Sequence, residues 1–69
     1  MDLTWEPDST ISARIDNGVA VIGANREGLL TLAENLVVLA REQPGTHVHL
    51  DQYNSLEDGS CELIIERLG

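Results

Sequence analysis

Two histidines and an aspartate alternate along the segment His47-Val48-His49-Leu50-Asp51, and they are the first side chains that could do chemistry. Alternate residues of a β-strand lie on one face, so the two imidazoles and the carboxylate would point the same way. Two histidines and a carboxylate can bind zinc or iron(II). Any exposed strand with two histidines has the same pattern, however, so we expect a solvated strand face and no metal.

A loop rich in carboxylates follows this segment. Its acidic residues are Asp51, Glu57, Asp58 and Glu62, and among them stand Tyr53, Asn54 and Ser55. Two carboxylates can act as general acid and base where burial keeps one of them protonated. The loop is polar throughout and predicts no such burial. It is typical either of a solvated loop or of a surface that binds a basic partner.

The other reactive residue types lack the neighbours that catalysis needs. A nucleophilic cysteine requires a base and a stabilised thiolate. His47 and His49 could lie on the adjacent strand, but the charge of Glu62 disfavours a thiolate at Cys61. Residues 23–28 (GANREG) lack the spacing of a phosphate-binding loop. We therefore expect a protein that is not an enzyme and that binds no cofactor.

Length and charge exclude further classes. The 69 residues suffice for one domain, and four Arg, no Lys and twelve Asp or Glu give a net charge of −8. No basic stripe is available for a phosphate backbone, so we expect no nucleic-acid binding. The longest apolar run is shorter than the roughly 20 residues of a spanning helix, and no leader-like segment opens the chain, so we expect no membrane partner. A single cysteine forms no internal disulfide, which fits a cytoplasmic protein.

The first half of the chain predicts a β-hairpin. Polar and apolar residues alternate over residues 10–15, Asn17-Gly18 follows, and residues 19–22 are apolar. Asn-Gly between two such runs is a strong hairpin signal. Two registers are open: a two-residue turn pairs Ile15 with Ala20, whereas a three-residue loop pairs Ile15 with Val19. We prefer the second, because it gathers more of the large apolar side chains on one surface.

The remaining residues predict a helix and two more strands. The helix spans residues 26–43, with Asn25 as its N-cap and Pro44-Gly45 after its end. An apolar arc of about 180° should face the core, and it is formed by Leu29, Leu30, Leu32, Ala33, Leu36, Val37, Leu39 and Ala40. The two strands cover residues 46–51 and 61–68, with inward side chains at Val48, Leu50, Leu63 and Ile65.

The order β-β-α-β-β predicts an α+β fold, in which one mostly antiparallel four-stranded sheet carries one helix on its apolar face. Residues 1–69 form a single domain, and residues 1–9 form an irregular or edge-strand arm whose Trp5 covers a rim of the core. In the preferred register some apolar residues lie on the sheet face opposite the helix, namely Ala20, Ile22, Ile64 and Leu68. They are either scattered surface residues or a patch that a partner covers. Because so small a core stabilises a chain only weakly, we take them as candidates for a dimer interface.

The C-terminal two thirds of the chain resemble a known family. Residues 47–67 (HVHLDQYNSLEDGSCELIIER) combine a His-x-His-x-Asp strand with a Gly-Ser step into Glu-Leu-Ile-Ile-Glu, after the helix segment of residues 27–33 (EGLLTLA). This pattern resembles the immunity protein 32 family over residues 23–67. Members are small bacterial α+β proteins of polymorphic toxin systems. The resemblance implies a non-enzymatic protein that neutralises a toxin delivered by sister cells.

The charge of the chain agrees with that implication. A toxin domain that attacks nucleic acid has a cationic cleft, and a protein of charge −8 would be steered to it. We expect the loop acids Asp51, Glu57, Asp58 and Glu62 to contact Arg or Lys of the toxin. Tyr53 would be the aromatic anchor, flanked by Asn54, His47 and His49. The alternative is a homodimeric accessory or regulatory domain.

Overall fold

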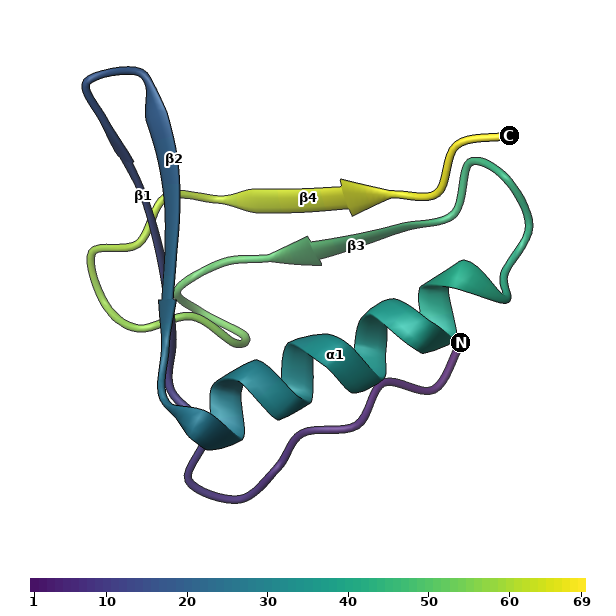
Figure 1. Cartoon of the computed structure of the whole chain (residues 1–69), viewed down its shortest axis with the longest axis horizontal. Helices are drawn as coiled ribbons and strands as arrows, with labels where there is room; N and C mark the ends of the chain where they lie inside the picture. The colour runs from purple at the N-terminus through teal and green to yellow at the C-terminus, as the bar shows by residue number, and fades with distance from the viewer.

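The computed structural model describes all 69 residues as a small α+β molecule with two β-hairpins and one helix. The elements are β1 (Ile11–Asp16), β2 (Val19–Ala24), α1 (Arg26–Ala40), β3 (His47–Leu50) and β4 (Leu63–Glu66). Strands β1 and β2 form one antiparallel sheet, and β3 and β4 form another. In Figure 1 the first hairpin runs crosswise to the second, and α1 lies between β3 and the N-terminal arm.

The predicted single four-stranded sheet is wrong, because a loop segment occupies the edge of β1 that a third strand would need. The amide of Glu57 donates to the carbonyl of Ile11 at 2.8 Å, and the amide of Cys61 donates to the carbonyl of Ala13 at 2.9 Å. These bonds satisfy the outer carbonyls of β1 without making a regular ladder. The α+β class and the element order are confirmed, and the four strands divide into two sheets.

The preferred register of the first hairpin is also wrong. Ile15 pairs with Ala20 and Asp16 with Val19, so the turn has two residues. Asn17 and Gly18 have φ values of 51° and 79°, the left-handed pair that a type I′ turn requires. Its twist matches that of the strands, and this local preference prevails over the larger apolar surface. Ala20 and Ile22 consequently lie on the same face as their partners Ile15 and Ala13, not on the opposite one.

Helix α1 begins where the sequence predicts and ends three residues earlier, at Ala40 instead of residue 43. Asn25 has an extended backbone, and its Oδ1 accepts a hydrogen bond from the Gly28 amide at 2.7 Å. The same Oδ1 accepts from the Thr10 amide at 3.0 Å, and the Asn25 side-chain amide donates to the Asp8 carbonyl at 2.9 Å. The cap therefore also fastens the N-terminal arm to the helix.

Replacing Asn25 should test this double role. We expect Asn25→Ala to lower the free energy of unfolding by about 2 kcal/mol, because it removes the cap and both bonds to the arm. Asn25→Asp keeps the acceptor and loses only the donor to Asp8, so it should cost roughly half as much. Urea denaturation of the two variants at equal protein concentration measures the difference. If Asn25→Asp costs nothing, the bond to the arm makes no contribution.

The face of α1 that points inward is not the one predicted. Its buried residues are Gly28, Thr31, Asn35 and Leu39, while Leu29, Leu30, Ala33, Leu36, Val37 and Ala40 are exposed. The polar members of the buried side have partners in the arm. The Thr4 amide donates to Asn35 Oδ1 at 2.8 Å, and the Glu6 amide donates to Thr31 Oγ1 at 2.9 Å. These bonds turn a polar strip of the helix toward the protein and leave most of the apolar arc outside.

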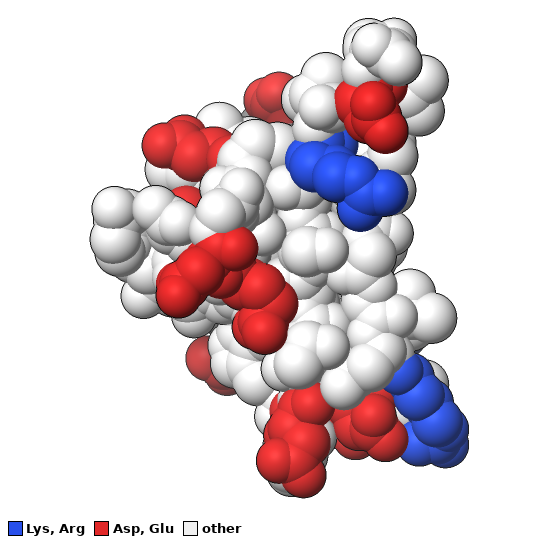
Figure 2. Space-filling model, turned by 90° about the vertical axis from the view of Figure 1, so that its left-hand side faces the viewer, with Lys and Arg blue, Asp and Glu red and all other residues white.

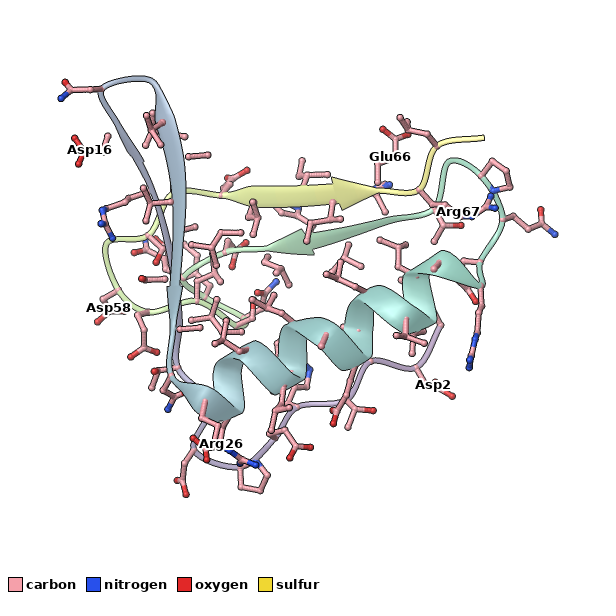
Figure 3. All side chains as sticks on the ribbon, viewed as in Figure 1. Asp2, Asp16, Arg26, Asp58, Glu66 and Arg67 are labelled. Carbon is pink, nitrogen blue, oxygen red and sulfur yellow. The ribbon has the colours of Figure 1, made fainter.

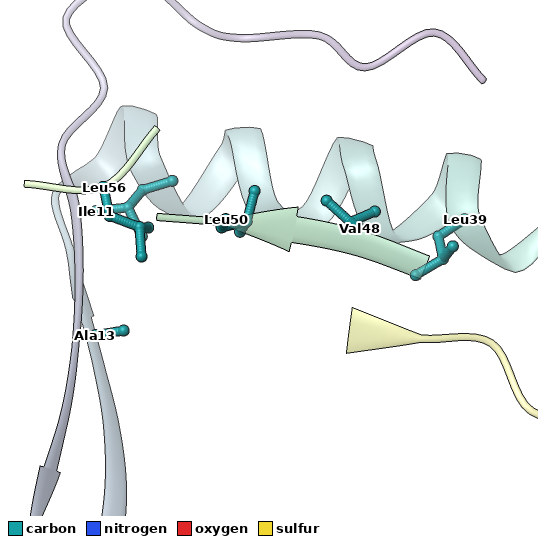
Figure 4. Packing of buried hydrophobic residues seen from close by; sticks show 6 residues of the cluster. All are labelled: Ile11, Ala13, Leu39, Val48, Leu50 and Leu56. Carbon is teal, nitrogen blue, oxygen red and sulfur yellow. The ribbon is translucent and has the colours of Figure 1, made fainter. Parts of the chain in front are cut away.

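The core is a small cluster on the side of α1 that faces β3. Its members lie in a row from Leu39 through Val48 and Leu50 to Leu56 and Ile11, with Ala13 beside them (Figure 4). Leu63 and Ile65 pack against it, as predicted, and so does Leu3 of the arm. Trp5 of the arm is 42% exposed, and its expected cover of the core rim stays a prediction. The single helix has neither the length nor the apolar character of a membrane-spanning segment.

Candidate functional site

The acidic loop, residues 51–62, is folded around the side chains of its own first residues. Asp51 Oδ1 accepts from the amides of Tyr53 and Asn54 at 2.9 and 3.1 Å. The Asn54 side chain forms two hydrogen bonds of its own: its Oδ1 accepts from the Asp51 amide at 3.0 Å, and its Nδ2 donates to the His49 carbonyl at 3.2 Å. Asp51 thus closes an Asx turn directly after β3. Its carboxylate holds the loop and is engaged on one oxygen.

The rest of the acidic loop is fixed to the body of the protein. Leu56 is the one buried residue of the loop and belongs to the core cluster. The Glu57 and Cys61 amides bond to β1, and Ser60 Oγ accepts from the Ala13 amide at 3.2 Å. Gln52 Oε1 accepts from the Gly59 amide at 3.0 Å and so ties the two ends of the loop. A loop held in this way loses little conformational entropy when a partner binds.

Held on this frame, several side chains of the loop are exposed to solvent. Tyr53 is 89% exposed, and Glu57 and Asp58 are exposed beside the Asp58-Gly59 turn. Figure 3 places Asp58 at the end of the molecule opposite Asp2 and Glu66. Arg26 and Glu27 form an ion pair at 3.6 Å, and Nε2 of His49 lies 3.2 Å from a carboxylate oxygen of Glu62. Glu57 and Asp58 form no ion pair within the chain.

The surface around Asp58 shows the same imbalance. Figure 2 views this side of the molecule, and acidic groups outweigh the basic ones, which stay apart from the central acidic group. Such a surface exerts an attractive field on cationic partners over about a Debye length. The arrangement can therefore bind and orient a positive surface.

The two histidines lie where the strand pattern places them. His47 and His49 are exposed on β3, and Val48 and Leu50 between them are buried. Nε2 of His49 lies 3.2 Å from Glu62 Oε2, so this histidine adjoins the acidic loop. Oδ1 of Asp51 is engaged in its turn, and the structure has no group of three His, Cys, Asp or Glu side chains that could hold a metal ion. Cys61 is half-buried, and the structure has no pocket.

The predicted dimer candidates do not form one face of one sheet. Ala20 and Ile22 belong to the first sheet, and Ile64 belongs to the second, where it pairs with His49. Leu68 follows β4, and Ile22, Ile64 and Leu68 are all exposed. Their role in an interface stays a prediction, although the common face that suggested it is absent.

Sequence reasoning identified the exposed residues of the loop but missed those that shape it. Leu56 is the only large aliphatic residue within residues 51–60, and such an isolated residue indicates an anchor. Gln52 and Ser60 bind backbone amides across the loop, and no short motif predicts such bonds. The composition of the loop predicts a partner contact for Asp51, whereas an Asp at the end of a strand is also typical of an Asx turn, which is the role it has here.

Comparison with known proteins identifies the relatives of this chain. The family model of immunity protein 32 matches residues 20–68, which include most of β2 and all of α1, the acidic loop and both strands of the second hairpin. No curated protein and no solved structure shows a significant match. The match covers far more than half of the sequence and agrees with the resemblance of residues 23–67. The chain therefore belongs to the immunity protein 32 family.

Proposed function

We propose that this protein neutralises a cognate toxin by placing its acidic loop on a cationic surface of that toxin. The family match implies a toxin as partner. The observation that carries the proposal is the preorganised loop, in which Tyr53, Glu57 and Asp58 are exposed while Leu56 and the bonds to β1 hold the backbone. Binding requires no catalytic group, so the protein acts as a non-enzymatic inhibitor, and it acts in the cytoplasm where a delivered toxin would meet its target.

The negative field and the tyrosine have separate tasks in this proposal. Glu57, Asp58 and Glu62 attract the toxin and raise the association rate, and the effect weakens as salt increases. Tyr53 supplies apolar area with few rotatable bonds, which is typical of a residue that dominates an interface. His49 is held beside Glu62, and Asn54 is the chain neighbour of Tyr53, so in this proposal both flank the contact with the toxin.

The proposal is tested with the toxin itself. The product of the neighbouring toxin gene should stop growth when it is produced alone and should be harmless when this protein is produced with it. The two purified proteins should elute together in gel filtration. A neighbour that is harmless alone, or toxic in the presence of this protein, would refute the proposal.

Loss of the Tyr53 ring should weaken the complex by about 30-fold, which corresponds to the roughly 2 kcal/mol of an interface hot spot. The measurement is the dissociation constant of Tyr53→Ala with the toxin by titration calorimetry. Trp5→Ala is the matched control, because Trp5 is also an exposed aromatic residue but lies on the N-terminal arm. A Tyr53→Ala protein that binds as tightly as the control would remove Tyr53 from the interface.

A further inference from the structure

The exposed side of α1 carries an apolar stripe with a regular spacing. The stripe has a central row and one flank. The central row is formed by Leu29, Ala33, Leu36 and Ala40, and the flank is formed by Leu30 and Val37. The steps of four, three and four residues are those of a coiled-coil seam. All six residues are exposed, with Leu29 at 56% and Leu36 at 44%. No residue within the stripe is charged.

We propose that this stripe is the interface of a homodimer in which α1 packs antiparallel against α1 of a second copy. The argument for a second copy is the order of large and small side chains. A two-fold axis at the level of residues 34 and 35 places Leu29 opposite the partner's Ala40, and Ala33 opposite the partner's Leu36. Each leucine then meets an alanine, so the stripe is complementary to itself, as a two-fold interface must be.

The residues on the flank of the stripe also pair well across the same two-fold axis. Leu30 and Val37 lie on one side of the seam, and in an antiparallel pair that side meets its own copy, so Val37 approaches the partner's Leu30. The other flank is formed by Leu32 and Leu39, which already pack in the core of their own chain. The alanines allow the two helix axes to approach to about 8 Å, the short end of the usual range.

The chain exposes more surface than a compact monomer of its mass, by less than an interface buries on each partner. The chain exposes 4756 Å², whereas a compact monomer of 7.5 kDa exposes about 4,200 Å². The molecule is only 19 Å thick against 31 and 30 Å in the other directions, so its elements lie side by side and leave α1 open on one side (Figure 1). A specific interface covers roughly 800 Å² on each partner. A second copy bound to the stripe would bury an area as large as this excess of exposed surface.

Charge separates this interface from the surface proposed for the toxin. The stripe is uncharged and the loop acids lie elsewhere, so a cationic partner gains nothing on the stripe. Two chains of charge −8 repel each other over the rest of their surfaces, and salt screens that repulsion. Added salt should therefore strengthen the dimer, whereas it should weaken the complex with a cationic toxin.

The mass of the purified chain in solution tests the proposal. Sedimentation equilibrium at about 100 μM should give twice the 7.5 kDa chain mass, and Leu29→Glu should give the monomer mass with unchanged helical circular dichroism. Ile64→Glu is the matched control, since Ile64 is 58% exposed on the second sheet, and it should remain dimeric. A monomeric wild-type chain, or a dimer that Leu29→Glu leaves intact or Ile64→Glu dissociates, would overturn the proposal.

Cross-linking tests the antiparallel register independently of any loss of folding. In a Cys61→Ser background, Ala33→Cys mixed with Leu36→Cys should give an oxidised heterodimer faster than either variant gives a homodimer, because residue 33 faces the partner's residue 36. A faster homodimer of Ala33→Cys alone would indicate a parallel pair and would contradict the two-fold arrangement. These experiments use the protein without its toxin, so they succeed or fail separately from the proposed function.

Discussion

Replacing Gly28 by alanine should remove about 2–3 kcal/mol from the free energy of unfolding, although alanine is the better helix former by about 1 kcal/mol. A Cβ at this position would lie 2.2 Å from the Thr10 carbonyl oxygen and 3.0 Å from atoms of Ala24 and Ile11. The nearest of these atoms is backbone, so it cannot turn away as a side chain would. A chain of this size has only about 3–5 kcal/mol to lose.

Gly18→Ala is the control for this prediction. Gly18 has a φ of 79° and open space around its Cα, so alanine there meets backbone strain without a clash and should cost about 1 kcal/mol. Thermal unfolding at one protein concentration should place the midpoint of Gly28→Ala roughly 10–20 °C below that of the wild-type chain, and that of Gly18→Ala about 5 °C below it. Equal shifts would show that the close approach of β1 to α1 is not tight.

Reversing the two free charges of the acidic loop should slow association with the toxin by about 100-fold at low salt, because steering by a charged surface changes on-rates over that range. In the double variant Glu57→Lys/Asp58→Lys each replacement adds two positive charges, so the net charge changes from −8 to −4. Neither side chain takes part in a hydrogen bond or ion pair within the chain. The fold should therefore be retained, and the effect should shrink as salt rises.

The matched control applies the same change in net charge at the other end of the molecule. Asp2→Lys/Glu66→Lys also brings the charge from −8 to −4, and both residues are exposed and far from Asp58 (Figure 3). Stopped-flow rates with the toxin should decrease only a few-fold in this control. If both double variants slow association equally, the overall charge attracts the toxin and the acidic loop has no special part in the interface.

The sequence contains enough information for the local elements, because each depends on neighbouring residues. Asn17-Gly18 predicts the turn, and Asn25 predicts the start of the helix. The alternation around Val48 and Leu50 predicts which side of β3 is buried. The register of the first hairpin follows turn geometry and not the apolar area of the strands, which favours the other register. The positive φ of Asn17 shows that the turn decides.

Features that depend on distant segments could not be predicted in this way. The amphipathic pattern of α1 predicts that Leu29 and Leu36 face the core. No residue near Thr31 or Asn35 in the sequence predicts that their side chains accept hydrogen bonds from the amides of residues 6 and 4. The position of the loop segment along β1 could not be predicted either, because it depends on backbone amides, which every residue type except proline has. For the candidate site, the exposed acids and Tyr53 follow from composition, but the frame that holds them depends on Gln52, Leu56 and Ser60.

The polar attachment of the N-terminal arm has a practical consequence. Residues 1–9 are held by hydrogen bonds from their backbone amides to Thr31 and Asn35 of α1, and by the bond from the cap residue Asn25 to Asp8. Leu3 is their contact to the core. If the arm detached, water would take over those hydrogen bonds at little cost, so its release requires much less free energy than unfolding the hairpins. The arm is thus the segment where a protease would cut first, and the place to join an affinity tag or a fluorescent reporter with the least disturbance to the rest of the protein.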